Sequence, residues 1–362
     1  MIILSLLFAS VVSISGFSPG FQPPSCGIGA ETAGGGVRAF SMGGVSAGMP
    51  DSAMVSSANP SASAWAVSTA FSWGTKVRDT RDLSWSGASA FPDISMIIPM
   101  PYNLQFSALL SNRSRINSED SVVFENGSGT IKWTGGSAES YIGLTERVSE
   151  HLAFSLGGKC FFGSALGDAV TTPYNPGQQV AVTTMYRDDL AFSPAWGAVF
   201  GAFMNTDYLS AGLSIATDRP GNLNVQRDYT GNSSADTTSH YSVPGELYAG
   251  LSVRIIPRLA IGLDFYSRKA LNLLGKTTEA GSTAASGFEV DAGNGFCIRG
   301  GFRAMNGLWR DGAMMYTGGA GYTVSGGKAS FDVGASYETW GADQSETVVF
   351  ASVMASENWL GR

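Results

Sequence analysis

The sequence is poor in charge and in cysteine. Charged residues make up 14% of the 362 residues, the formal net charge is -7, and no cluster of Lys and Arg occurs. A nucleic-acid partner is therefore not expected, because holding a phosphate backbone needs a concentrated basic surface. The three cysteines, Cys26, Cys160 and Cys297, are too far apart for a C-x-x-C motif and imply no disulfide framework. We expect no cofactor and no metal site.

Long apolar runs are also missing. No stretch after the first residues reaches 18 consecutive apolar residues, so no membrane-spanning helix is expected. Residues 1–15 form a short apolar run that ends in small residues, with Ser13 and Ser15 before Gly16. This pattern is typical of a secretory signal peptide. If the exported chain sits in a membrane, it must do so as a closed barrel of strands.

What the sequence does have is glycine, aromatic residues and alternation. Gly occurs 47 times and aromatics make up 11%, a composition that favours an all-β protein with many turns. Several segments place apolar side chains on one face and polar or small ones on the other, with a period of two. These segments are residues 152–162, 209–215, 247–255, 259–268, 296–303 and 330–338. We assign to the polar faces, and hence to a barrel lumen, the charged residues Lys159, Arg254, Asp264, Arg268, Arg299, Arg303, Asp332 and Glu338.

The connections between these segments alternate in length. Short ones at 149–151, 205–207 and 257 alternate with expected long loops at 163–184, 217–242 and 270–286. Tight turns on one rim and long loops on the other are typical of outer-membrane barrels. Gly326-Gly327 departs from the rule, as a tight turn where a long loop is due. At about 10 residues per strand plus connections, residues 65–362 would form a transmembrane antiparallel barrel of about 14 strands.

A motif near the N-terminus carries a family resemblance. Residues 38–62 read RAFSMGGVSAGMPDSAMVSSANPSA, which resembles the N-terminal signature of the FadL-like and PorV-like outer-membrane proteins. Weaker matches at 97–101, 243–246 and 298–302 extend the resemblance over most of the chain. The resemblance implies a barrel of 14 strands in the cell outer membrane, with an N-terminal hatch, here residues 16–64, folded inside it.

Within this hatch, Pro50 and Asp51 favour the start of a short helix through Ala58, and Asn59-Pro60 disfavours its continuation. Apolar side chains there could line a binding site for a hydrophobic ligand, or could simply pack the hatch against the barrel wall. The candidate ligand-binding or gating residues are Phe40, Met42, Met49, Met54, Asn59 and Pro60.

Two functions from different classes follow from the resemblance. In the first, the barrel is a hatch-gated channel for hydrophobic compounds such as long-chain fatty acids, with outer-membrane lipid and a hydrophobic small molecule as partners. It predicts a continuous apolar pocket. In the second, a PorV-like barrel is a docking platform for secreted proteins or secretion-system components, and it predicts a plugged lumen.

An enzyme is not expected. Gly44 to Gly48 match the G-x-S-x-G string of a nucleophile elbow, but no strand–turn–helix pattern surrounds them. A hydrolase using Ser46 would need His151 or His240, the two histidines of the chain, within hydrogen-bond reach.

Overall fold

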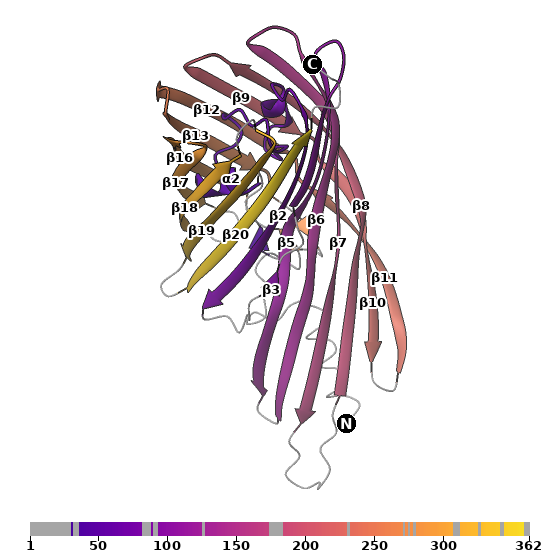
Figure 1. The fold of residues 1–362 in the computed structure, drawn as a ribbon. Coiled ribbons are helices and arrows are strands. Elements are labelled where there is room, and N and C mark those ends of the chain that lie inside the picture. The colour runs from indigo at the N-terminus through magenta and orange to yellow at the C-terminus, as the bar shows by residue number, and fades with distance from the viewer. Residues whose placement is uncertain are drawn as a thin grey trace.

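The computed structural model is a closed antiparallel barrel (Figure 1). The structure describes residues 30–31, 36–81, 88–89, 93–124, 127–173, 184–229, 232–270, 272–273, 276–277, 280–306, 312–324, 327–340 and 344–357. The predicted signal peptide, residues 1–15, lies outside these ranges. No helix among the described residues is long and apolar enough to cross a membrane.

Fourteen antiparallel strands form the wall, as predicted. Ten of them are continuous strands: β2 (Thr69–Arg81), β4 (Asp93–Pro99), β5 (Leu104–Phe124), β6 (Gly127–Arg147), β7 (Leu152–Pro173), β8 (Thr184–Asn205), β13 (Leu259–Arg268), β16 (Gly281–Gly293), β17 (Phe296–Asn306) and β18 (Met314–Thr323). The barrel closes where β2 pairs with the last strand, β20 (Gln344–Glu357), which follows β19 (Ala329–Trp340).

The two remaining wall strands are each broken once. One consists of β9 (Leu209–Ala216) and β10 (Arg219–Tyr229), and the other of β11 (Asn232–Val243) and β12 (Glu246–Ile256). Strand β10 pairs with β11, and β9 pairs with β12, so the two breaks lie side by side in the sheet. Four two-residue strands complete the sheet: β1 (Ala30–Glu31), β3 (Ala88–Ser89), β14 (Asn272–Leu273) and β15 (Lys276–Thr277).

Short connections lie on one rim, as expected. The turns that join β4 to β5, β6 to β7, β8 to β9 and β12 to β13 are all tight. Asn294 and Gly295, both at positive φ, make a further tight turn between β16 and β17. Because of this turn, the β18–β19 connection that contains Gly327 falls on the same rim. The departure expected at Gly326-Gly327 was therefore wrong as to the rim, although Gly326 itself lies outside the described residues. The opposite rim does not consist of long connections alone, since only two residues separate β5 from β6 and β10 from β11.

Much of what the sequence predicted as long loops is strand. Residues 163–173 extend β7, and residues 219–229 and 232–243 are β10 and β11. Together with β5, β6 and β8 they extend beyond the rest of the wall, toward the bottom of Figure 1. We call this part of the sheet the extension. It stands at the end opposite the tight turns, which is the outer side in outer-membrane barrels.

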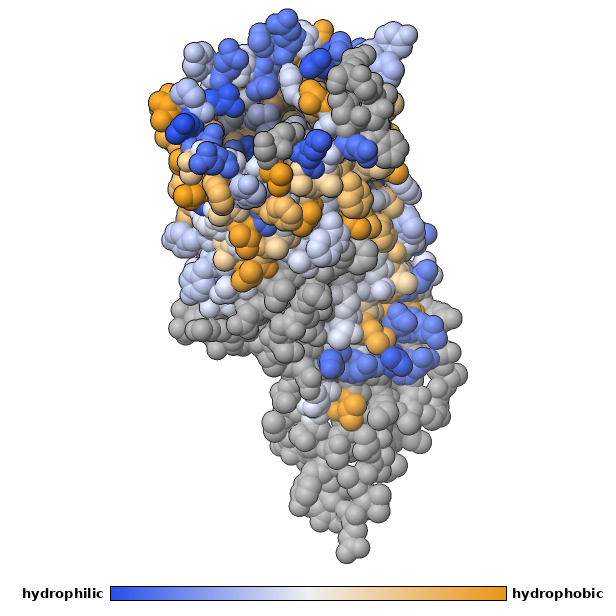
Figure 2. Space-filling view, viewed as in Figure 1, coloured by the Kyte–Doolittle hydropathy of each residue, from blue (hydrophilic) through white to orange (hydrophobic). Residues whose placement is uncertain are grey.

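The outer surface of the barrel carries a belt of exposed apolar side chains. Examples are Phe154 and Leu156 on β7, which alternate with the buried inward-facing Ser155. Figure 2 shows this belt as an orange band below a hydrophilic rim. Apolar side chains outside and polar ones inside are what a wall between lipid and an aqueous or packed lumen requires. The barrel thus has the surface of a membrane-spanning protein.

The polarity of the sheet inverts in the extension. There the inward side chains are apolar, such as Leu223 and Val225, and the outward ones are polar, such as Asn222 and Asn224. The inversion occurs at the level where β8 has an extra residue, with Ser193 and Pro194 opposite Phe162 of β7, and where the broken strands are interrupted. Since a one-residue insertion exchanges the two faces of a strand, these irregularities convert a lipid-facing sheet into one suited to water.

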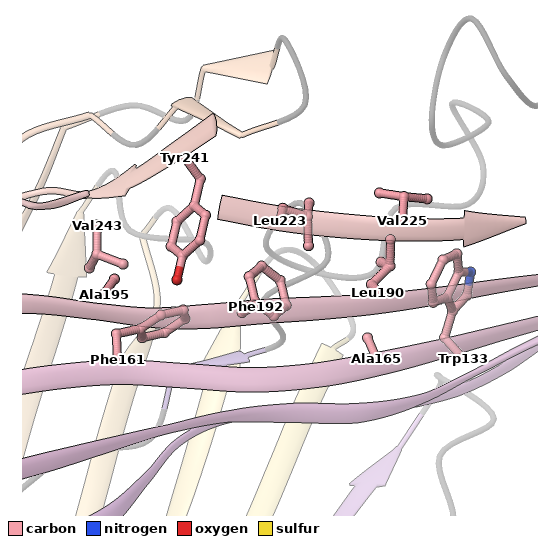
Figure 3. Close-up of a cluster of buried hydrophobic side chains, with 10 residues drawn as sticks. All are labelled: Trp133, Phe161, Ala165, Leu190, Phe192, Ala195, Leu223, Val225, Tyr241 and Val243. Carbon is pink, nitrogen blue, oxygen red and sulfur yellow. The ribbon is translucent and has the colours of Figure 1, made fainter. Parts of the chain in front are cut away.

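The inverted face forms a hydrophobic core of its own (Figure 3). The rings of Phe161, Phe192 and Tyr241 meet edge to face, with centroids 5.6 to 6.0 Å apart. The hydroxyl of Tyr241 donates to the carbonyl of Ser193 at 2.7 Å. All ten members are at most 5% exposed, so this cluster holds the extension together and offers no open surface to a solute.

Candidate functional site

The chain from residue 36 to residue 66, here called the inner segment, lies inside the barrel. Its helix α2 (Gly36–Ser41) contacts β17 to β20, and its 3-10 helix η1 (Pro60–Ser63) contacts β6 to β9. Of its side chains only that of Ser52 is exposed. The segment therefore crosses the lumen from one part of the wall to the opposite part, near the tight-turn rim.

The helix predicted from Pro50 to Ala58 was wrong. That stretch has no helix: the carboxylate of Asp51 accepts the backbone N–H groups of Ala53 and Met54, at 2.9 and 3.2 Å, as a helix cap would, but the turn that it closes does not continue. Asn59-Pro60 begins η1 rather than ending a helix. The Asn59 side chain caps it by accepting the N–H of Ser61 at 3.1 Å.

The inner segment presses its backbone against glycines of the wall. A Cβ atom on Gly212 would lie 1.9 Å from the carbonyl oxygen of Ala47, and one on Gly287 would lie 2.3 Å from that of Met42. No side chain can occupy such space without displacing the segment. The backbone of the segment approaches Gly250 and Gly301 as closely, and side chains of the segment lie as close to Gly262 and Gly319.

Asp264 on β13 fastens the middle of the inner segment. Its carboxylate accepts three consecutive backbone N–H groups, from Ser46 at 2.6 Å, Ala47 at 2.5 Å and Gly48 at 3.0 Å. Hydrogen bonds to an ionised acceptor are stronger than neutral ones. The residue predicted as a lumen-facing charge is thus a fixed anchor for the segment.

Arg38 anchors the start of the segment through a second group of charges. Its guanidinium makes a two-point contact with the carboxylate of Glu289, both distances being 2.8 Å, and donates to the carbonyl of Pro50 at 2.7 Å. Glu289 also accepts from Arg299, which in turn pairs with Asp332. Burial alone would lower the pKa of Arg38, but its carboxylate neighbours raise it above the ordinary value, so this arginine stays charged.

The end of the segment is tied to β7 and β8. The side-chain amide of Asn59 donates to the carbonyls of Ala47 at 3.3 Å and Ala202 at 3.0 Å. Lys159 donates to the carbonyl of Ser57 at 2.8 Å, and the Ser61 hydroxyl lies 2.8 Å from that of Ser155. Asn59, predicted as a gating residue, therefore joins two parts of the segment to each other and to the wall.

A buried group of charges crosses the lumen on the outer side of the inner segment. We call it the charge layer: Arg113, Glu139, Lys159, Arg219 and Glu246. Their side chains are at most 11% exposed. Arg113 on β5 pairs with Glu246 on β12, although these strands are not neighbours in the sheet. The layer thus bridges opposite parts of the wall.

A cavity of about 60 Å³ lies between the charge layer and the inner segment. Thr283 and Arg303 line it, and the Thr283 hydroxyl and Arg303 Nε have no hydrogen-bond partner in the described part of the chain. At roughly 15 Å³ per molecule, such a space holds a few waters. No continuous apolar pocket crosses the described part of the lumen, because both layers interrupt it.

The remaining predicted residues have varied surroundings. Arg268 is buried on β13, Glu338 is half-buried on β19, and Arg254 is exposed at the tight-turn rim, where it donates to the carbonyl of Asp207 at 3.2 Å. Phe40 packs edge to face on Phe350 of β20, with centroids 4.4 Å apart.

Met42, Met49 and Met54 are buried and line a small void within the inner segment. Sequence reasoning missed four of the five residues of the charge layer, all but Lys159. The sequence offers one partial signal, the Pro244-Gly245 pair directly before Glu246, which marks an interruption of the strand but not the partners of the charge.

The histidines do not approach Ser46. His151 lies in the turn between β6 and β7, where its ring bonds the carbonyl of Asn205, and His240 bonds Asn222 on the extension. Neither lines a cavity beside Ser46. This arrangement offers Ser46 no histidine as a base.

A 14-stranded antiparallel barrel with an apolar outer belt and a buried N-terminal segment defines a class of outer-membrane protein. No model of a known protein family matches the chain, and no curated protein matches its sequence. Solved structures do match. A FadL homologue of Pseudomonas aeruginosa superposes with a TM-score of 0.69 at 13% identity, over 90% of this chain and 99% of the other.

Two further similar structures are toluene transporters. TbuX of Ralstonia pickettii matches with a TM-score of 0.62 at 13% identity, over 90% of this chain and 98% of the other. TodX of Pseudomonas putida matches with a TM-score of 0.59 at 14% identity, over 91% and 99%. These proteins are transporters or a transporter homologue and not enzymes. The chain therefore has the FadL-like barrel fold, and the predicted resemblance is confirmed at that level.

Proposed function

We propose that this protein transports hydrophobic compounds across the outer membrane. The observation that supports this most is the barrel shared over nine-tenths of the chain with a FadL homologue and two toluene transporters. The apolar belt supports a place in the bilayer. Long-chain fatty acids and single-ring hydrocarbons both fall within the proposal.

In this proposal the inner segment is the hatch of the channel. Phe40, Met42, Met49 and Met54 supply the apolar surface near the ligand, and Asn59 and Pro60 hold the end of the hatch to the wall. The inner segment and the charge layer are the barriers that a solute meets on its way. The cavity between them, where the Thr283 hydroxyl and Arg303 Nε have no hydrogen-bond partner among the described residues, is the proposed resting place for a polar end of the solute.

The test combines ligand identification with uptake. The protein would be expressed in an outer-membrane host that lacks its own hydrophobic-compound channel, and radiolabelled toluene and oleate uptake would be measured. Native mass spectrometry of the gently delipidated protein would look for a co-purified apolar molecule. Uptake above the empty-vector control supports the proposal. Absence of both uptake and ligand, in a protein shown to be folded, would overturn it.

A second candidate, a docking platform for secreted proteins, is favoured by one observation. In the part of the lumen that the structure describes, two layers block the way, which a solute channel must open but a platform can keep shut. The platform function predicts no uptake and a secreted host protein that co-purifies in fixed ratio with the barrel. Binding should weaken when charges are introduced on the outward face of the extension, for instance by Asn222→Asp with Asn224→Asp.

A further inference from the structure

Arg303 on β17 is a cation inside the lumen that forms no ion pair with a described residue. It lines the cavity of about 60 Å³ between the charge layer and the inner segment. Its Nε atom is buried and has no hydrogen-bond partner in the described part of the chain. Glu338 lies in the same row of the sheet, but Met315 on β18 stands between the two. A charge that is withdrawn from water without a partner is costly, so a counter-charge is expected at this place.

The two carboxylates that line the same cavity are bound by other donors. Glu139 pairs with three cations of the charge layer. Both oxygens of Asp264 accept backbone N–H groups of the inner segment. Neither carboxylate forms an ion pair with Arg303. The charge of this arginine is therefore not met by the acidic side chains around it.

The charges of this part of the lumen do not balance. The charge layer contributes three cations and two carboxylates. The lining of the cavity adds one cation, Arg303, and one carboxylate, Asp264. Four positive charges against three negative ones leave a net charge of +1. One monovalent anion would balance it, and no side chain of these two groups supplies that anion.

Thr283 places a neutral donor beside Arg303. In the pairing of β16 with β17, Ala285 lies directly opposite Arg303, and Thr283 is the diagonal neighbour on the same face. The Thr283 hydroxyl is buried, lines the cavity and has no hydrogen-bond partner among the described residues. Ala285 between them also lines the cavity and has only a methyl group, so it leaves the space open. A guanidinium and a hydroxyl can both donate to an anion.

We propose that this cavity binds one small monovalent anion, with chloride as the occupant in salt solution. The guanidinium of Arg303 and the hydroxyl of Thr283 donate to the ion, and its charge balances the net charge of +1. The cavity has room for it, because a chloride ion is only slightly larger than a water molecule. The ion is a counter-ion of the fold and does not depend on the proposed transport function.

Bromide locates the site directly, because it replaces chloride and scatters X-rays anomalously. Crystals of the delipidated protein would be grown with bromide as the only halide. An anomalous peak is expected within hydrogen-bond distance of Arg303 and Thr283, and Arg303→Met should abolish it. Arg254→Met is the matched control and should keep the peak, because Arg254 also forms no ion pair with a described residue but does not line the cavity.

Two crystallographic results would overturn the proposal. One is a wild-type cavity that holds water and no bromide peak. The other is the carboxylate of a bound lipid in the place of the halide, since the site would then belong to a ligand and not to a counter-ion. Neither result bears on uptake of hydrophobic compounds, so the transport function would stand or fall by its own test.

Heat unfolding in two salts provides a measurement that needs no crystal. The half-time of unfolding of the detergent-purified barrel would be compared in chloride and in gluconate, an anion too large for the cavity, at equal ionic strength. With chloride at ten times its dissociation constant, the wild-type half-time should be about tenfold longer than in gluconate. Thr283→Val should reduce this gain, because the ion loses one of its two donors.

Arg303→Met separates a counter-ion site from a merely structural arginine. Its half-time should be the same in both salts, and in gluconate it should be at least as long as that of the wild type, because the unbalanced charge is gone. Arg254→Met should keep the wild-type response to chloride. If Arg303→Met unfolds faster than the wild type by the same factor in both salts, the arginine has a structural role only and the proposal is overturned.

Discussion

Removal of the Asp264 carboxylate should loosen the middle of the inner segment selectively. In Asp264→Ala three buried N–H groups lose their common acceptor. A buried donor left without a partner costs about 1 to 3 kcal/mol. Since neighbouring losses do not add in full, we expect a total of about 3 kcal/mol for opening of this turn.

That loss corresponds to roughly 100-fold faster exchange of the amides of residues 46–48, since each 1.4 kcal/mol is about a factor of ten. Hydrogen–deuterium exchange of the detergent-purified protein, followed by mass spectrometry of peptides from this region, measures it. Asp218→Ala is the control, because Asp218 accepts one N–H, from Gly245, at a strand break in the wall. Unchanged exchange in Asp264→Ala, or equal acceleration in both variants, would refute the anchoring role.

Three further outcomes are expected. Gly212→Val should displace the inner segment and expose it to protease in detergent, whereas Gly318→Ala should not, because the nearest atom to its new Cβ lies 3.9 Å away; equal cleavage of both variants would contradict the close-packing argument. Phe192→Ala should destabilise the core of the extension by about 3 to 5 kcal/mol, seen as proteolysis of the extension from intact cells; a resistant extension would show that this cluster is dispensable. Leu213→Arg should impair folding into lipid vesicles by about 2 to 4 kcal/mol, while Asn222→Arg should be neutral; the reverse order would place the bilayer over the extension.

The sequence predicted the part of the barrel that faces lipid. Segments such as 209–215 and 247–255 keep one phase of alternation over their whole length, and each lies within a wall strand. The extension was mistaken for loops because its outward residues, Asn222 and Asn224 among them, have the composition of loops. The alternation with Leu223 and Val225 was present, but in the opposite phase.

The site could be predicted only in part, for a physical reason. The segment that carries Met42 and Asn59 was found from a local motif, because the signature is continuous in sequence. The charge layer could not be, since Arg113 and Glu246 are 133 residues apart and meet only when the sheet closes on itself. Local patterns predict faces of strands; they do not predict which side chains meet across a lumen.

The seat of α2 bears on how the barrel is assembled. This helix lies near the start of the chain, yet it contacts β17 to β20, the last four strands of the wall. A barrel that is completed in chain order must therefore pass through a stage in which β6 to β9 already offer a seat to η1 but the seat of α2 does not yet exist. During that stage one end of the inner segment can be docked while α2 is still unbound. Closure of β20 on β2 and docking of α2 should then occur as one late event, since α2 itself contacts β20 beside that seam.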